Sequence, residues 1–290
     1  MPSCQLGEGT HVRIVNAGGR LALELSDGIV DVATASNGSF GPDVQEVYDQ
    51  WSEFVEWAKG QTELTGPHPA QEDLGAPAPR PRQIFAIGLN YKDHADETGS
   101  AYPDSPLVFT KFQTSIAAPF GSLVLPSGDV DWEVEMVVII GTGGANIAEA
   151  DAWSRVAGLT VGQDYSERAI QLAGTPPQFS MGKSFPGFSP LGPRLVTIDE
   201  FENVDDLALS CDIDGEIVQD GRTNHLLFNV PQLIAWLSSI TPLTPGDLIF
   251  TGTPAGVGMA RNPRRFLEPG EVVTSTIEGI GSIAQRCVSA

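Results

Sequence analysis

Short β-rich segments separated by turn residues dominate the chain from residue 83 to its end, and this succession most constrains the fold. The segments are IFAIGL, PLVFTKF, VEMVVIIG, RLVTI, LALSCDIDGEIV, DLIFTGT, EVVTSTIEG and IAQRCV. Helical patterns are few, and we predict helices here only over 147–156, 164–173 and 230–239. Many short strands with occasional helices favour a mostly-β α+β domain, a sandwich or barrel-like roll, over a doubly wound parallel sheet.

The first 82 residues have a different texture. Residues 11–33 are typical of a small β-meander broken by glycines, and residues 43–59 carry apolar side chains at helical spacing, which predicts one amphipathic helix. Residues 66–82 are rich in proline and poor in apolar side chains, as an extended linker is. We therefore predict a small N-terminal α/β domain over 1–70, a proline-rich linker over 71–82 and a large domain over 83–290.

The charge of the chain excludes whole classes of partner. Asp and Glu number 37 against 16 Lys and Arg, so the formal net charge is −21. Nucleic acids and anionic membranes are bound mainly through Lys and Arg, so we expect neither as a partner. Cys4, Cys211 and Cys287 form no spaced framework, and the N-terminus has no basic start followed by an apolar run. These features predict a cytoplasmic protein without a disulfide scaffold or a structural zinc site.

The sharpest motif is the run DWEVEMVVII at 131–140. Side chains alternate between the two faces of a strand, so Asp131, Glu133 and Glu135 would share one face and the apolar residues between them the other. Glu133 and Glu135 could then converge on one cation. The alternative is the solvated face of an ordinary strand. Against it, five apolar residues follow, and an unpaired charge that enters a buried strand is costly.

A third carboxylate, Asp164, stands in the segment GLTVGQDYSERAIQL. On the helix predicted over 164–173, Asp164, Arg168 and Gln171 would lie on one face. Taken alone, this pattern is equally typical of a surface ion pair near the start of a helix.

Two further polar groups could belong to the same site. His94 and Glu97 follow a predicted strand at a spacing of one helical turn, which lets a carboxylate orient the histidine ring and raise its basicity. A surface ion pair is the alternative. Lys183 lies beside a loop rich in proline and glycine, where the lysine is either a solvated charge or a functional group.

Two glycine-rich stretches do not support nucleotide binding. Residues 139–146 lack the third glycine of a dinucleotide fingerprint, and residues 249–258 lack the lysine and hydroxyl of a P-loop. The second stretch still supplies backbone amides and Thr253 in a tight turn, which could seat a substrate carboxylate.

Five motifs in a fixed order resemble the fumarylacetoacetate hydrolase family over residues 82–288. They are GLNYKDHADE, VDWEVEMVVIIG, GQDYSERAIQ, KSFPGFSPLGP and GDLIFTGTPAGVG. The resemblance implies a mixed β-sandwich roll that forms a homodimer. Some acylpyruvase-like members carry an Asp-Thr pair soon after the Lys-Ser-Phe triplet, where this chain has Pro186 and Gly187.

The resemblance also implies a set of site residues, matched by position. In the family, three carboxylates hold a divalent cation, a histidine–glutamate pair activates water, and a lysine lies in the active site. An arginine–glutamine pair contacts substrate, and a threonine binds its carboxylate. The matching residues are Glu133, Glu135 and Asp164 for the metal, His94 and Glu97 for the base, Lys183 for the lysine, Arg168 and Gln171 for the substrate contacts, and Thr253 for the carboxylate.

An all-oxygen donor set suits Mg²⁺ or Mn²⁺. The expected activity is therefore metal-dependent hydrolysis of a C–C bond in an acylpyruvate-like or other 2,4-dioxo acid, with a small anionic dioxo or oxo acid as the partner. Two alternatives on the same metal site are an oxaloacetate-type decarboxylase and a hydroxydiene-dioate isomerase. A third alternative is a binding protein without activity.

Overall fold

The structure is a computed structural model that describes residues 11–290. Expectations that concern residues 1–10, including Cys4 and the start of the predicted N-terminal domain, lie outside the described residues. Among the described helices, none has both the length and the apolar character needed to cross a membrane.

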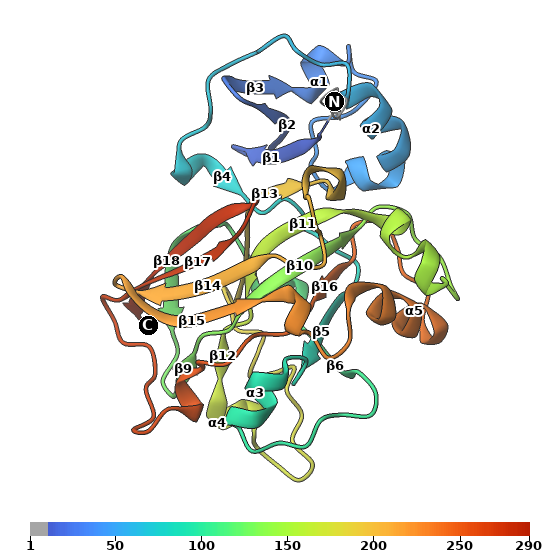
Figure 1. Ribbon diagram of the computed structural model, residues 1–290. Coiled ribbons are helices and arrows are strands. Elements are labelled where there is room, and N and C mark those ends of the chain that lie inside the picture. The colour runs from blue at the N-terminus through green and yellow to red at the C-terminus, as the bar shows by residue number, and fades with distance from the viewer. Residues whose placement is uncertain (1–10) are drawn as a thin grey trace, which may run out of the picture.

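A mixed, 11-stranded sheet runs through the centre of the molecule (Figure 1). The strand order is β3-β2-β1-β13-β11-β10-β16-β5-β6, with β4 added beside β1 and β7 beside β13. The strands are β1 (Arg13–Ala17), β2 (Arg20–Leu25), β3 (Gly28–Asp31), β4 (Leu74–Gly75), β5 (Ile84–Gly88), β6 (Leu107–Thr110), β7 (Ile116–Ala117), β10 (Val134–Ile140), β11 (Val156–Gln163), β13 (Ser189–Val196) and β16 (Leu248–Phe250).

A five-stranded sheet, ordered β15-β14-β17-β18-β8, packs against one face of the large sheet. Its strands are β8 (Phe120–Leu125), β14 (Ala208–Ile213), β15 (Glu216–Arg222), β17 (Val272–Ile277) and β18 (Gly281–Ser289). A two-stranded sheet of β9 (Val130–Asp131) and β12 (Ser166–Glu167) lies near the site. The expected mostly-β sandwich roll is thus confirmed.

Helices are short. They are α1 (Val32–Ala35), α2 (Trp51–Ala58), α3 (Lys92–Glu97), α4 (Arg168–Gln171) and α5 (Val230–Ile240), with short 3-10 turns at Glu46–Gln50, Gln71–Asp73, Gln113–Ser115, Glu149–Asp151, Trp153–Arg155, Ile198–Glu200, Thr223–His225 and Gly258–Ala260. Helix α5 confirms the prediction over 230–239, and a capping box between Asn229 and Gln232 fixes its start. The helix predicted over 43–59 is a 3-10 turn that leads into α2.

Two helix predictions are wrong. Residues 147–156 form two separate 3-10 turns and then enter β11. Residues 164–173 are helical only in α4, because Ser166 and Glu167 pair with Asp131 and Val130 as a short ladder. Pairing with a strand from elsewhere in the chain outweighs the local helical pattern.

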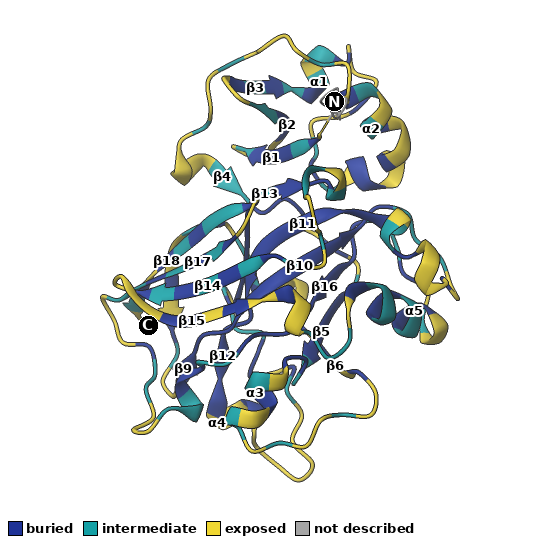
Figure 2. Ribbon diagram, in the orientation of Figure 1, coloured by how far each residue is buried: buried dark blue, intermediate teal, exposed yellow. Residues whose placement is uncertain are grey.

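Alternate side chains of β10 pack into two different hydrophobic cores. The apolar residues Trp132, Val134 and Met136 face the five-stranded sheet and α5, within the core between the two sheets. The intervening residues Val137 and Ile139 face the opposite way, into a second core shared with β1 to β3 and α2. Every residue of β10 and β11 is buried (Figure 2), so the carboxylates at one end of these strands stand on a rigid support.

The N-terminal strands continue the large sheet. Strand β1 pairs antiparallel with β13, with Arg13 opposite Val196 and Ile14 opposite Leu195. The segment predicted as an extended linker also contributes β4, which pairs with β1 on its way to β5. The domain boundaries at 70 and 82 stay a prediction, since one sheet crosses them.

Candidate active site and metal centre

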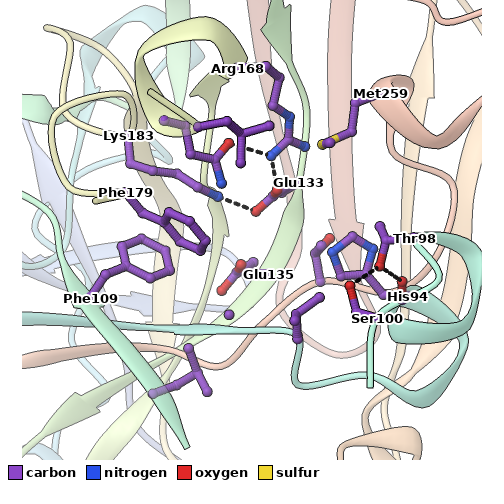
Figure 3. Close-up of a pocket in the computed structure, with 16 residues that line it drawn as sticks. His94, Thr98, Ser100, Phe109, Glu133, Glu135, Arg168, Phe179, Lys183 and Met259 are labelled. Atoms are coloured by element: carbon purple, nitrogen blue, oxygen red, sulfur yellow. Dashed lines mark hydrogen bonds and ion pairs between the residues drawn. The ribbon is translucent and has the colours of Figure 1, made fainter. Parts of the chain in front are cut away.

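One cavity of about 230 Å³ gathers most of the predicted site residues (Figure 3). Those that line it are His94, Glu133, Glu135, Arg168, Gln171, Lys183 and Thr253. Glu97 and Asp164 do not line the cavity, but each contacts a residue that does. The structure therefore brings together every residue that the sequence predicted for the site.

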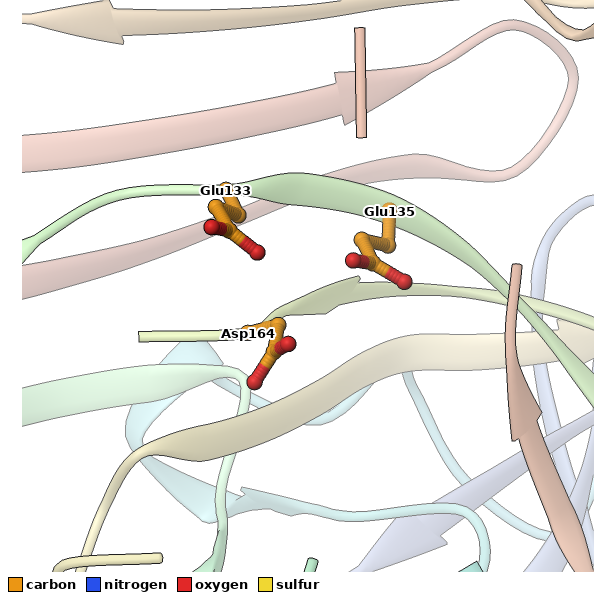
Figure 4. A group of neighbouring side chains, drawn as sticks. All are labelled: Glu133, Glu135 and Asp164. Carbon is orange, nitrogen blue, oxygen red and sulfur yellow. The ribbon is translucent and has the colours of Figure 1, made fainter. Parts of the chain in front are cut away.

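Three carboxylates converge at the entrance of β10 and the exit of β11 (Figure 4). Oxygens of Glu133, Glu135 and Asp164 all lie within 4.8 Å of one another. Antiparallel pairing explains this, since Val134 stands opposite Gln163 and the Asp164 N–H donates to the Glu133 carbonyl at 2.9 Å. Asp164 thus reaches the group from the end of a strand and not, as expected, from a helix that also carries Arg168.

Buried charges of alternating sign form a continuous chain through the site. Lys183 Nζ lies 2.6 Å from Glu133 Oε2 and 2.7 Å from Asp164 Oδ2. On one side the chain continues from Asp164 to Lys111. On the other side Arg168 Nη1 lies 2.8 Å from Glu133 Oε1, and Arg168 Nε donates to Asp131 Oδ2 at 2.8 Å. The order is Lys111, Asp164, Lys183, Glu133, Arg168, Asp131, three cations and three carboxylates.

Glu135 does not take part in this row of ion pairs. Its side chain accepts a hydrogen bond from the Gly252 N–H at 2.7 Å, and it has no cationic partner among the described residues. Burial, with the negative charges of Asp164 and Glu133, raises the pKa of Glu135 well above its ordinary value. For Glu133 burial acts in the same direction, but Lys183 and Arg168 outweigh it and lower its pKa to about 2.

The donor set fits a divalent cation. A buried carboxylate without a positive partner is costly, and a cation between Glu133, Glu135 and Asp164 would supply that partner. All three donors are carboxylate oxygens, the ligands that Mg²⁺ and Mn²⁺ prefer. The three cations and three carboxylates of the ion-pair row already neutralise one another in charge. Glu135 therefore carries the negative charge that a bound cation would neutralise.

A histidine–glutamate pair on α3 faces these carboxylates across the cavity. His94 Nδ1 lies 2.7 Å from Glu97 Oε1, and Glu97 Oε2 accepts from the Gly256 N–H at 2.9 Å. A carboxylate at Nδ1 favours the tautomer with its proton there, which leaves Nε2 as a proton acceptor. Thr98 and Ser100 complete this side of the cavity.

The loop 252–259 holds three carboxylates of the site through its backbone. The N–H groups of Gly252, Gly256 and Gly258 donate to Glu135, Glu97 and Asp131, respectively. Gly252 has φ +100°, and a Cβ there would lie 2.8 Å from Asn90 Cβ. Glycine is thus required for the loop to approach so closely.

Thr253 lines the cavity on the same loop, but its hydroxyl is already engaged. It donates to the Val134 carbonyl and accepts from Gln219 Nε2, each at 2.8 Å. In this arrangement Thr253 fixes the loop to β10, and its predicted contact with a substrate carboxylate would require the hydroxyl to turn.

The sequence reasoning missed Lys111 as a site residue and gave Asp131 no partner. Lys111 is 3% exposed and contacts both Asp164 and the Lys183 carbonyl. The only sequence signal was the rarity of lysine, since the chain has four lysines and a net charge of −21; the burial of Lys111 beside Asp164 follows from the fold. Phe109 and Phe179 were also missed; their rings pack edge to face at 5.6 Å and form an apolar wall of the cavity.

Known proteins are similar to this chain over most of its length. The family model for the fumarylacetoacetate (FAA) hydrolase C-terminal domain matches residues 83–288. The mitochondrial oxaloacetate tautomerase Fahd2a of Rattus norvegicus is 45% identical over 215 residues, which cover 73% of this chain and 68% of that protein.

Solved structures share the whole fold. A crystal structure of a protein from Mycobacterium smegmatis is 54% identical, covers 96% of this chain and 99% of its own, and superposes with a TM-score of 0.92. Maleylpyruvate hydrolase from Sphingobium sp. SYK-6, in complex with manganese(II) and pyruvate, is 25% identical with a TM-score of 0.75, and covers 97% of this chain and 99% of its own.

Proposed function

This chain belongs to the fumarylacetoacetate hydrolase family, and from that premise we propose that it is a divalent-metal-dependent enzyme for keto–enol conversion of oxaloacetate or a similar 2-oxo dicarboxylic acid. The reaction moves one proton between the enol oxygen and the neighbouring carbon, and breaks no C–C bond. Mg²⁺ or Mn²⁺ is the proposed metal, and the protein is proposed to act in the cytoplasm as a homodimer.

The observation that carries the proposal is the His94–Glu97 pair opposite a carboxylate centre within one small cavity. Tautomerisation needs a single base that takes a proton from one atom of the substrate and returns it to another. His94 Nε2 suits this task because Glu97 holds the other ring nitrogen. The 45% sequence identity with an oxaloacetate tautomerase over 215 residues also supports this reaction.

The remaining residues have complementary tasks. A divalent cation held by Glu133, Glu135 and Asp164 would polarise the oxygens of the 2-oxo acid and so acidify the neighbouring C–H group. Arg168 and Lys183 would bind the substrate's negative oxygens, since both are buried cations at the cavity. Phe109 and Phe179 would keep water away from this side, which strengthens the electrostatic interactions.

C–C hydrolysis, the activity expected from the sequence, is the second candidate. The observation in its favour is the same His94–Glu97 pair, because a base of this kind can also activate water. The similarity to a maleylpyruvate hydrolase that binds manganese(II) and pyruvate supports it too.

The two candidates predict different products. With Mn²⁺ or Mg²⁺ present, enol-oxaloacetate should lose its ultraviolet absorbance faster with enzyme than without, and release no extra pyruvate. Acetylpyruvate and fumarylpyruvate should remain intact. Release of pyruvate from the acylpyruvates, without faster ketonisation of oxaloacetate, would overturn the proposal in favour of the hydrolase.

A matched pair of variants ties the reaction to the base. Replacing His94 by Gln should lower kcat/KM by about 10²–10⁴-fold, the usual range for loss of a general base. His68→Gln is the control, since His68 is exposed and lies outside the cavity. An equal effect of both substitutions would remove His94 from the reaction.

A further inference from the structure

We propose that Asp131 is a positioning residue for substrate binding, which acts by holding the Arg168 guanidinium toward an anionic ligand in the cavity. Asp131 does not line the cavity and is fully buried. The inference deepens the proposed function, on which it rests only in taking the ligand to be an anion.

Both carboxylate oxygens of Asp131 accept two hydrogen bonds each. Its Oδ1 accepts from the N–H groups of Trp132 at 2.8 Å and Gly258 at 2.7 Å. Its Oδ2 accepts from the Met259 N–H at 2.9 Å and from Arg168 Nε at 2.8 Å. The three backbone donors fix the plane of the carboxylate, so the direction from which Arg168 Nε can approach is fixed as well.

The Arg168 guanidinium is thereby held on two sides. Nε is bound to Asp131, while Nη1 donates to Gln171 Oε1 at 2.8 Å and lies 2.8 Å from Glu133 Oε1. Nη2 also lies 2.8 Å from Asp131 Oδ2, but outside hydrogen-bonding geometry, and it has no hydrogen-bond partner within residues 11–290. A buried donor without an acceptor is rare in proteins. Arg168 lines the cavity, so a guanidinium held in this way keeps a fixed position relative to a ligand there.

A close approach of the backbone makes this anchor possible. A Cβ at Gly258 would lie 1.9 Å from the Arg265 carbonyl oxygen and 2.8 Å from Asp131 Oδ1. Only glycine therefore lets this part of the loop bring two adjacent amides onto the carboxylate. The same loop carries the Gly256 N–H that donates to Glu97. The loop therefore connects Asp131, which holds Arg168, with Glu97, which holds His94.

Charge and position predict opposite effects when Asp131 is neutralised. Removing a negative charge close to an anion site would, by Coulomb attraction alone, tighten anion binding. If Asp131 instead positions Arg168, anion binding weakens although the site has become more positive. The sign of the change in affinity therefore separates the two roles.

The test is pyruvate and oxalate binding to the Mn²⁺-loaded, full-length protein, measured by titration calorimetry. Asp131→Asn keeps the size of the side chain and should raise the Kd of both anions about tenfold, as loss of a positioning partner commonly does. Asp129→Asn is the matched control. Asp129 lies two residues before Asp131 and is exposed, so this substitution removes a negative charge without touching the buried contacts of Asp131.

A double-mutant cycle shows whether Asp131 acts through Arg168. Arg168→Lys should weaken anion binding, and adding Asp131→Asn to it should weaken binding little further, since the two residues form one unit. Independent, multiplicative effects would overturn the inference, and so would anion binding as tight as in the parent. If Asp131→Asn fails to fold, NMR of the parent decides. A slowly exchanging Arg168 Nε–H with pyruvate bound supports the anchor, and fast exchange overturns it.

These readouts are independent of turnover. A protein that does not ketonise oxaloacetate but loses anion affinity in Asp131→Asn would refute the proposed function and leave the anchor in place. Normal ketonisation of oxaloacetate by the parent, with unchanged anion affinity in Asp131→Asn, would support the proposed function and refute the role of Asp131.

Discussion

Replacing Glu135 by Gln should abolish metal binding while leaving the metal-free protein at least as stable as the parent. Glutamine keeps the length of the side chain and an oxygen that can accept from the Gly252 N–H. It removes the carboxylate charge of the centre that has no cationic partner in the part of the chain that the structure describes. Since that charge is buried and lies beside two other carboxylates, its loss costs the metal-free fold nothing in electrostatic free energy.

The magnitude follows from linkage between binding and folding. A cation at about 100 times its Kd stabilises the fold that binds it by about 2.7 kcal/mol. At about 2–4 °C per kcal/mol for a chain somewhat smaller than this one, the parent should unfold about 5–10 °C higher with Mn²⁺ than without. The variant should show no such increase, and its metal-free Tm should equal or exceed that of the parent.

Scanning calorimetry with and without Mn²⁺, paired with a titration of Mn²⁺, measures both effects. Glu149→Gln is the control, because Glu149 is exposed on a 3-10 turn in the connection between β10 and β11, at the end of these strands away from the carboxylates. A Glu135→Gln protein that binds Mn²⁺ with the parent's Kd, or that gains the same increase in Tm, would refute the metal assignment. A large fall in its metal-free Tm would refute the argument about the unpaired charge.

The structure also predicts the behaviour of three other groups. Glu97→Gln should lower kcat about 10–100-fold and speed amide exchange at Gly256 in hydrogen-exchange mass spectrometry, because one carboxylate holds both His94 and that loop. Wild-type exchange at Gly256 would contradict the link. Lys111→Met should destabilise the metal-free protein by about 1–3 kcal/mol in denaturant unfolding, since two buried acceptors lose their donor; an unchanged midpoint would show that other donors replace it. Burial raises the pKa of Cys287 to about 12, so this thiol stays protonated at pH 8 and should not react with a disulfide reagent in the folded protein. Labelling of Cys287 before unfolding would show the burial to be wrong.

The sequence was most informative where one strand decides both fold and chemistry. The alternation of DWEVEM placed the apolar residues on one face and Glu133 and Glu135 on the other, and the structure has this arrangement. A period of two is a local property of the chain, so it can be read without knowledge of the partner strands. The mostly-β roll was predictable for the same reason.

Sequence reasoning failed where distant segments decide the conformation. Asp164 and Arg168 have helical spacing, yet the ladder between Ser166 and Asp131 keeps the chain extended until α4. The roles of Lys111 and Asp131 depend on which distant segments the fold brings beside them, Asp164 and Lys183 for Lys111 and Arg168 for Asp131. No local pattern carries that information, whereas the resemblance to a family could place the remaining site residues by position.

The pairing of β1 with β13 has a consequence for how the chain avoids aggregation through an open sheet edge. Without residues 11–75, β13 would present unpaired backbone groups along an edge, flanked by the apolar side chains of Leu195 and Val196, which are now fully buried. Exposed edges of this kind are templates for pairing with another molecule and hence for aggregation. The N-terminal strands thus cover this edge of the large sheet, and shortening the chain to residues 83–290 would expose the edge and favour aggregation.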